Sequence, residues 1–92
     1  MSLNFPSLLQ HEQAREALAH LTRQLQAGAR QSASLAALQD FDSSALSVML
    51  ALLRVARAQS GDLIWHDVPP RIRSLAQVYG VDSVLGLDAP GH

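Results

Sequence analysis

The longest apolar segment of the chain runs from residue 45 to residue 56. Only two polar residues interrupt it, so it carries more than the single apolar stripe of a surface helix. The polar turn Asp42-Ser43-Ser44 precedes this segment, and Gly61 follows it. Aspartate and serine are preferred at helix N-termini, and glycine often adopts the left-handed conformation that ends a helix. The pattern therefore predicts a largely buried central helix with a polar turn at its start.

Apolar residues on both sides of this segment recur with the spacing of helices and strands. Two further helices are expected, over residues 11–27 and 70–79, where apolar side chains repeat every three or four positions. In the second of these helices, one face should carry Ile72, Leu75, Ala76 and Tyr79. Short apolar runs predict a strand at residues 3–9, another at residues 62–68, and a strand or extended segment at residues 81–87. Residues 30–39 could form a helix by composition, but their position before the Asp42 turn favours a strand. Because Pro6 lacks the N–H that a sheet ladder needs, the first strand should lie at an edge.

The alternation of strands and helices is typical of an α/β fold, in which helices pack against a sheet. We expect a mixed sheet of about four strands. A chain of 92 residues suffices for one domain. We place this domain at residues 1–88 and expect residues 89–92 to form a disordered tail.

Composition narrows the classes of function. The formal net charge of −1 gives no electrostatic footprint for nucleic acid or for an anionic membrane. The chain has no cysteine, which excludes disulfides, thiol catalysis and zinc sites with sulfur ligands. Its histidines show no metal-ligand spacing, and no nucleophile–base set or phosphate-binding glycine loop is visible. We therefore expect a cytoplasmic protein that is not an enzyme, with no catalytic residues, metal or cofactor and no direct membrane insertion.

Two segments together resemble a known family. The run FDSSAL opens the central helix, and VPPRIRSLAQVYGVDSVL follows the next predicted strand. This combination resembles a STAS domain, the fold of anti-anti-sigma factors and of the STAS domains of sulfate transporters. The resemblance implies a STAS-like fold and a protein-binding role.

Within the family, two groups imply different partners. The later segment is most similar to the small STAS subunit of the Mla phospholipid-transport ABC system, also known from toluene tolerance. There, a hydroxyl residue at the position of Ser43 contacts the ATPase subunit, so the protein would work at the inner face of the membrane through a transporter complex. In anti-sigma factor antagonists, the equivalent of Ser43 is phosphorylated by a kinase, which controls binding to an anti-sigma factor. The glycine of that group's turn is Ala45 here. A nucleotide-binding regulatory domain is a third alternative, which only the family resemblance supports.

The candidate site follows from these alternatives. Ser43, Asp42 and Ser44 are candidates for partner binding or phosphorylation, although residues of these types also serve simply as helix caps. Arg71 and Arg73 are candidate partner contacts, although exposed arginines most often only face solvent. Only one strand precedes the first helix, so an uncovered sheet edge could favour a homodimer.

Overall fold

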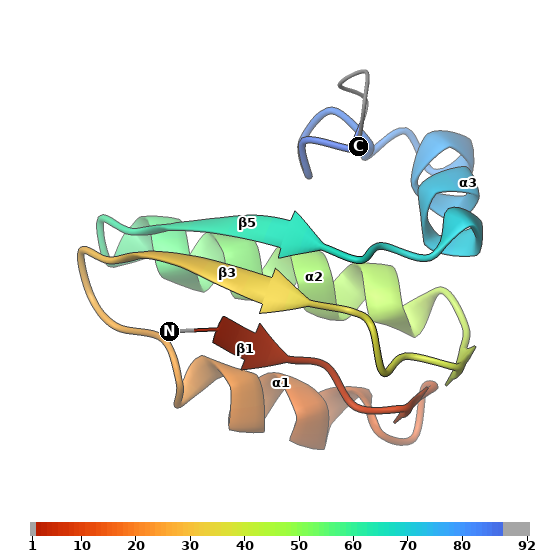
Figure 1. Cartoon of the computed structure of the whole chain (residues 1–92), viewed down its shortest axis with the longest axis horizontal. Coiled ribbons are helices and arrows are strands. Elements are labelled where there is room, and N and C mark those ends of the chain that lie inside the picture. Colours follow the sequence, from red (N-terminus) through yellow and green to blue (C-terminus); the bar gives the residue numbers. More distant parts are fainter. Residues whose placement is uncertain (1, 88–92) are drawn as a thin grey trace.

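The computed structural model describes residues 2–87, in which short strands and three helices alternate (Figure 1). In chain order the elements are β1 (Ser2–Asn4), β2 (Leu8–Leu9), α1 (Ala14–Thr22), β3 (Arg30–Ser34), β4 (Asp40–Phe41), α2 (Ser44–Ala58), β5 (Asp62–His66) and α3 (Pro70–Val78). The predicted α/β class is confirmed. Each predicted helix is found, although α1 is shorter than the range 11–27.

The strands form two small parallel sheets. One sheet has the strand order β1-β3-β5, and the other pairs β2 with β4. The predicted mixed sheet of about four strands is therefore wrong, since the described residues contain five strands in two sheets whose pairs are all parallel. The connections through α1 and α2 explain this, because a parallel pair needs a crossover that returns the chain to the same end of the sheet.

Pro6 divides the first predicted strand. The segment 3–9 forms β1 and β2, which pair with different partners on either side of the proline. A proline has no N–H to donate, so the ladder between β1 and β3 ends at the bond from Phe5 N–H to the Ser34 carbonyl, at 2.9 Å. The expected edge position of this segment is confirmed for β1, which lies at one end of the strand order.

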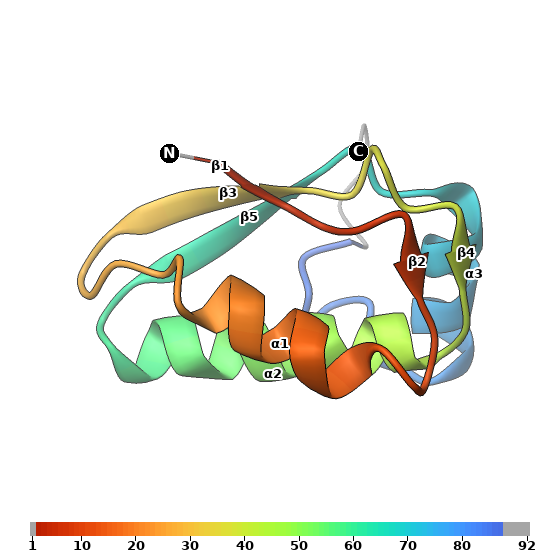
Figure 2. The ribbon, with the colours of Figure 1, turned by 90° about the horizontal axis from the view of Figure 1, so that it is seen from below.

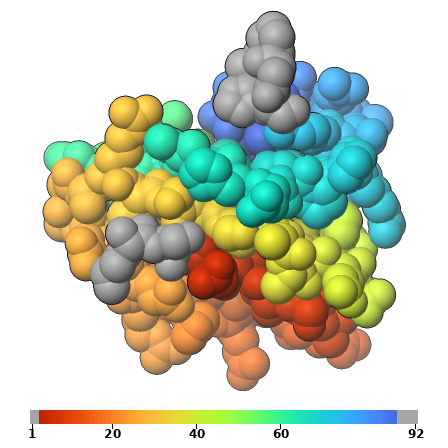
Figure 3. Space-filling model, viewed as in Figure 1, coloured from red at the N-terminus to blue at the C-terminus, as the bar shows by residue number. Residues whose placement is uncertain are grey.

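Helices α1 and α2 lie side by side beneath one face of the three-stranded sheet, and α3 stands at its end (Figure 2). Strand residues that face these helices are buried, and the core continues into α2. The largest fully buried side chains are Leu3, Phe5, Leu9, Leu21, Leu35, Met49, Leu52 and Ile72. The opposite face carries Asn4, Ser32, Ser34, Ile64 and His66, all half-buried or exposed, and Figure 3 looks onto it.

The end of α2 differs from the expectation at one residue. Ser60, with φ of 64°, takes the left-handed conformation that the sequence assigns to Gly61. Glycine is required at position 61 for another reason. A Cβ there would lie 2.5 Å from the backbone oxygen of Ala29, which no real side chain tolerates. Gly61 therefore lets the turn after α2 approach the turn before β3.

The predicted strand at residues 81–87 is wrong, because this segment forms consecutive turns. Its hydrogen bonds are local. The Leu85 N–H donates to Val81, and the Leu87 N–H to Asp82. Leu85 and Leu87 are nevertheless buried in the core. The apolar residues that suggested a strand thus anchor a loop. The expected tail at residues 89–92 lies outside the described residues. Within residues 2–87, no helix has the length and hydrophobicity needed to cross a bilayer.

Candidate functional site

The turn that begins α2 is held by the carboxylate of Asp42. Its Oδ1 accepts a hydrogen bond of 2.8 Å from the backbone N–H of Ser44. Its Oδ2 accepts one of 3.2 Å from the backbone N–H of His11, in the loop before α1. One side chain therefore satisfies a donor in the first turn of α2 and ties this turn to a segment far away in the sequence. The turn is fixed before any partner binds.

These hydrogen bonds also stabilise the charged form of the carboxylate. The backbone N–H of Ser44 is the main cause of a lowered pKa of Asp42, followed by the Ser44 hydroxyl, while the backbone N–H and the charge of His11 contribute less. Partial desolvation opposes them. Asp42 is therefore an anion over the whole neutral range.

Ser43 occupies the N-cap position without using its side chain as a cap. Its backbone is helical, at φ −62° and ψ −13°, and its hydroxyl forms no capping hydrogen bond. The backbone carbonyl of Ser43 accepts from Leu46 and Ser47 instead. Ser43 is exposed, and its hydroxyl forms no hydrogen bond within residues 2–87. The alternative that Ser43 serves only as a helix cap is thus wrong, since Asp42 performs that role.

A hollow of about 310 Å³ adjoins Ser43. We call its lining the α2 head surface, which consists of Ser43, Leu46, Ser47, Leu50, Tyr79 and Val81. Tyr79 is 59% exposed and the adjoining Val78 is 79% exposed, so the rim is apolar and open to solvent. Tyr79 is therefore exposed, although its spacing in the sequence groups it with Ile72 and Ala76. It follows the last residue of α3, beyond the sheet and helices that cover Ile72 and Ala76.

The two candidate arginines have different surroundings. Arg71 lies over the ring of Phe41, with its guanidinium carbon 5.1 Å from the ring centroid. This contact places a cation beside the residue that precedes Asp42. Arg73 is half-buried, and its Nη1 donates to the Leu87 carbonyl at 3.0 Å. Of the pair, Arg71 borders the start of α2, while Arg73 secures the loop at residues 81–87.

Sequence reasoning located Ser43 but missed the rest of the α2 head surface. Ser47 was a detectable signal, because it lies one helical turn after Ser43 in an otherwise apolar run. Leu50 continues the same stripe. Tyr79 and Val81 come from α3 and the loop after it, so no local pattern shows that they meet α2.

The arrangement is suited to protein contact. It combines an exposed hydroxyl, an apolar hollow and a fixed turn, and an aromatic side chain such as Tyr79 is common at interfaces. Among the described residues, no three histidine, aspartate or glutamate side chains converge as metal ligands would. No family model matches the chain, and the search of curated proteins finds no significant match.

Proposed function

We propose that this chain is a non-catalytic protein-interaction module with a STAS-like fold, which binds its partner through the α2 head surface. The observation that carries the proposal is the exposed side chain of Ser43 at the start of α2, a helix that buries one face in the core, beside an apolar hollow. Exposed apolar residues grouped around a polar turn favour a partner over solvent.

The partner class that we propose is the ATPase subunit of a phospholipid-transport ABC system. The sequence resemblance supports this class, with its FDSSAL turn and the segment from Val68 to Leu85. In the mechanism, the partner's groups contact Ser43 and fill the hollow beside Tyr79. Contact with one ATPase conformation in preference to another would shift the balance between them. Such coupling is typically worth about 1–3 kcal/mol, or roughly 5–150-fold in an equilibrium constant.

The decisive experiment is affinity purification of the chain from its own cells, with identification of what binds. We expect an ABC ATPase to co-purify. Tyr79→Ala and Ser43→Arg should each release it, because one removes the rim of the hollow and the other blocks the turn. Arg23→Ala is the control, since Arg23 follows the last residue of α1, at the end of the helical layer opposite the start of α2 (Figure 2).

Two results would reject this proposal. One is an ATPase that stays bound to both variants as firmly as to the wild type. The other is a purified complex whose rate of ATP hydrolysis equals that of the ATPase without this chain. The control variant shows whether a substitution away from the α2 head surface also weakens binding. Circular dichroism of each variant shows whether that variant is folded.

The second candidate is an anti-sigma factor antagonist that is switched by phosphorylation of Ser43. The exposure of its hydroxyl favours this function, because a kinase needs an accessible acceptor. A phosphoryl group there would lie at the positive end of α2, which stabilises it. The neighbouring carboxylate of Asp42 would repel the phosphoryl group. That carboxylate already accepts hydrogen bonds from the backbone N–H groups of Ser44 and His11.

Phosphopeptide mapping of the protein from several growth conditions tests this switch. Modification of Ser43 together with a co-purifying anti-sigma factor or serine kinase would favour the antagonist over the transporter subunit. If Ser43 is unmodified in every condition, the phosphorylation switch is excluded. Partner contact then remains as the proposed role of Ser43.

A further inference from the structure

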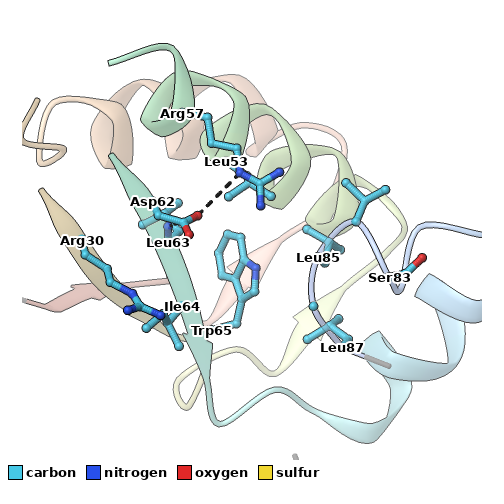
Figure 4. A pocket seen from close by; sticks show the side chains of 12 residues that line it. Arg30, Leu53, Arg57, Asp62, Leu63, Ile64, Trp65, Ser83, Leu85 and Leu87 are labelled. Atoms are coloured by element: carbon cyan, nitrogen blue, oxygen red, sulfur yellow. Dashed lines mark hydrogen bonds and ion pairs between the residues drawn. The ribbon is translucent and has the colours of Figure 1, made fainter. Parts of the chain in front are cut away.

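A second cavity, of about 240 Å³, lies along the outer edge of β5 and shares no residue with the α2 head surface. Its lining comes from both faces of the sheet. Leu63 and Trp65 belong to the face that packs on α2, while Ile64 belongs to the open face. Side chains from both faces line one cavity only where the cavity follows the edge of the strand between them. Figure 4 shows this groove between β5 and the loop at residues 83–87.

The backbone of β5 presents unused hydrogen-bonding groups to the groove. The Asp62 N–H donates to Ala29 at 3.1 Å, and the His66 carbonyl accepts from Leu35 at 3.0 Å. Alternate residues of a strand point their backbone groups to opposite sides, so those of Leu63 and Trp65 point away from β3. The Leu63 N–H is satisfied by the Asp62 carboxylate at 2.9 Å. The Leu63 carbonyl and both backbone groups of Trp65 have no partner within residues 2–87.

The loop across the groove does not supply those partners. The N–H groups of Leu85, Gly86 and Leu87 donate within the loop, and the Leu87 carbonyl accepts from Arg73. It packs apolar side chains below the groove and leaves the strand edge open.

The indole of Trp65 is a second, independent observation. Trp65 is 7% exposed, and its Nε1–H is buried without a hydrogen-bond partner among the described residues. Figure 4 shows this nitrogen on the side of the ring that faces Leu85 and Leu87, which line the cavity together with Trp65. A buried donor without an acceptor is costly, and most such groups in proteins are satisfied. An acceptor that enters the groove would satisfy it.

The charge of the groove indicates the kind of ligand. Arg30 and Arg57 line it together with Asp62. Arg57 Nε lies 3.6 Å from the Asp62 carboxylate. Arg30 is exposed and has no ion pair within residues 2–87, so the lining has one cation in excess. This favours an anionic partner.

We propose that the edge of β5 binds an extended, acidic polypeptide segment as an added strand. Such a strand forms up to three backbone hydrogen bonds, with the Leu63 carbonyl and the two groups of Trp65. The residue opposite Trp65 directs its side chain into the cavity, where a hydroxyl or carboxylate oxygen accepts from the indole N–H. The residues beside it lie on the open face, and the carboxylate opposite Ile64 is the one that can meet Arg30. This site goes beyond the proposed function and does not depend on it.

The test uses the peptide acetyl-Val-Glu-Thr-Glu-Val-amide and NMR of the ¹⁵N-labelled full chain. The chain has one tryptophan, so its indole N–H signal is identified directly. We expect saturable shifts of the Trp65 indole and amide signals, with half-saturation at or below about 1 mM. The same peptide N-methylated at threonine lacks the donor for Trp65 and should not bind. A version with lysine in place of glutamate should bind much more weakly.

Two variants test the named contacts. Trp65→Phe keeps a ring but removes the indole donor, and should weaken binding roughly fivefold, as expected for one hydrogen bond. Arg30→Gln should weaken the acidic peptide but not a neutral version with glutamine. Arg23→Gln is the control and should change neither.

Several results would overturn the proposal. Equal binding of the N-methylated peptide excludes strand addition, and equal binding of the lysine peptide excludes the role of charge. A Trp65 amide that is protected from exchange in the peptide-free protein means that the edge is already paired. An indole signal that shifts with protein concentration alone means that a second copy of the chain occupies the groove.

Discussion

Residues 60 and 61 allow a test in which neighbouring substitutions should have opposite effects. The sequence places the left-handed end of α2 at Gly61, whereas the structure places it at Ser60, with φ of 64°. We predict that Ser60→Gly stabilises the protein and that Gly61→Ala destabilises it. If Gly61 were the left-handed residue and Ser60 still helical, Ser60→Gly would cost stability, because glycine is unfavourable inside a helix.

The magnitudes follow from the local geometry. A left-handed conformation costs a residue with a Cβ about 1–2 kcal/mol. Glycine at position 60 removes this cost and adds about 0.5–1 kcal/mol of unfolded-state entropy. The net gain should be about 0.5–1 kcal/mol, or roughly 2–8 °C in Tm for a domain of this size.

The loss at position 61 has two parts. An alanine Cβ would lie 2.5 Å from the Ala29 oxygen, which also accepts the Asp62 N–H at 3.1 Å. Relief of the overlap must displace that oxygen. Overpacking typically costs about 1–3 kcal/mol and a lost hydrogen bond about 0.5–1.5 kcal/mol. The smaller entropy of unfolded alanine returns about 0.4–1 kcal/mol. We expect a net loss of about 1–3 kcal/mol.

Urea unfolding followed by circular dichroism measures both effects. Gly80→Ala is a matched control, because Gly80 has φ of 70° and open space around its Cα, so alanine there meets only the conformational cost. Amide exchange separates the mechanisms, since Gly61→Ala alone should accelerate exchange at the Asp62 N–H. A Ser60→Gly protein less stable than the wild type, or a Gly61→Ala protein of unchanged stability, would refute this reasoning.

Three further predictions concern α2 and its start. Because the pKa of Asp42 is lowered from 3.8, its carboxylate stabilises the fold fully above that pH, and the contribution is lost as the pH falls through the lowered value. Asp42→Asn should therefore be less stable than the wild type at neutral pH, with a gap in the urea midpoint that closes in acid; a constant gap would contradict this. Ser43→Ala should change the free energy of unfolding by less than about 0.5 kcal/mol, since its hydroxyl is not a cap, and a larger loss in urea unfolding would show that it is. Leu52→Ala should cost about 2–5 kcal/mol, because Leu52 is fully buried, while half-buried Leu50 should cost clearly less when changed to alanine; similar losses would place Leu50 in the core.

The elements that the sequence predicted correctly are those with a strong local pattern. The apolar run at residues 45–56 predicted a helix, and α2 forms there. Strand β5 forms in a short apolar segment that contains Ile64 and Trp65. The segment of β3 was ambiguous between helix and strand, and only its position before the Asp42 turn favoured a strand. The short strands β2 and β4 were missed because two residues carry no periodicity. Their pairing depends on Pro6 and on the approach of Leu9 to Phe41, which are distant in the sequence.

Burial at the C-terminal end was predicted less well, for a physical reason. Val84 and Leu85 are adjacent in one apolar segment, yet Val84 is exposed and Leu85 is buried. A strand would explain such alternation, but turns with local hydrogen bonds produce it too. Tyr79 fits the helical period of α3, but nothing in the described part of the chain covers it fully, and it is exposed. Periodicity reports which side chains share a face, and only the assembled fold decides whether a neighbour covers that face.

The division of roles within the turn explains why the candidate site can serve a partner. Asp42 provides the cap of α2 and the link to His11, so the geometry of the turn does not depend on the neighbouring hydroxyl. Ser43 can therefore contact another protein, or be replaced, without loss of the fold. A surface fixed in advance also loses less conformational entropy on binding, which strengthens association for the same contacts. Substitutions at Asp42 should then reduce stability and partner binding together, whereas substitutions at Ser43 should reduce binding alone.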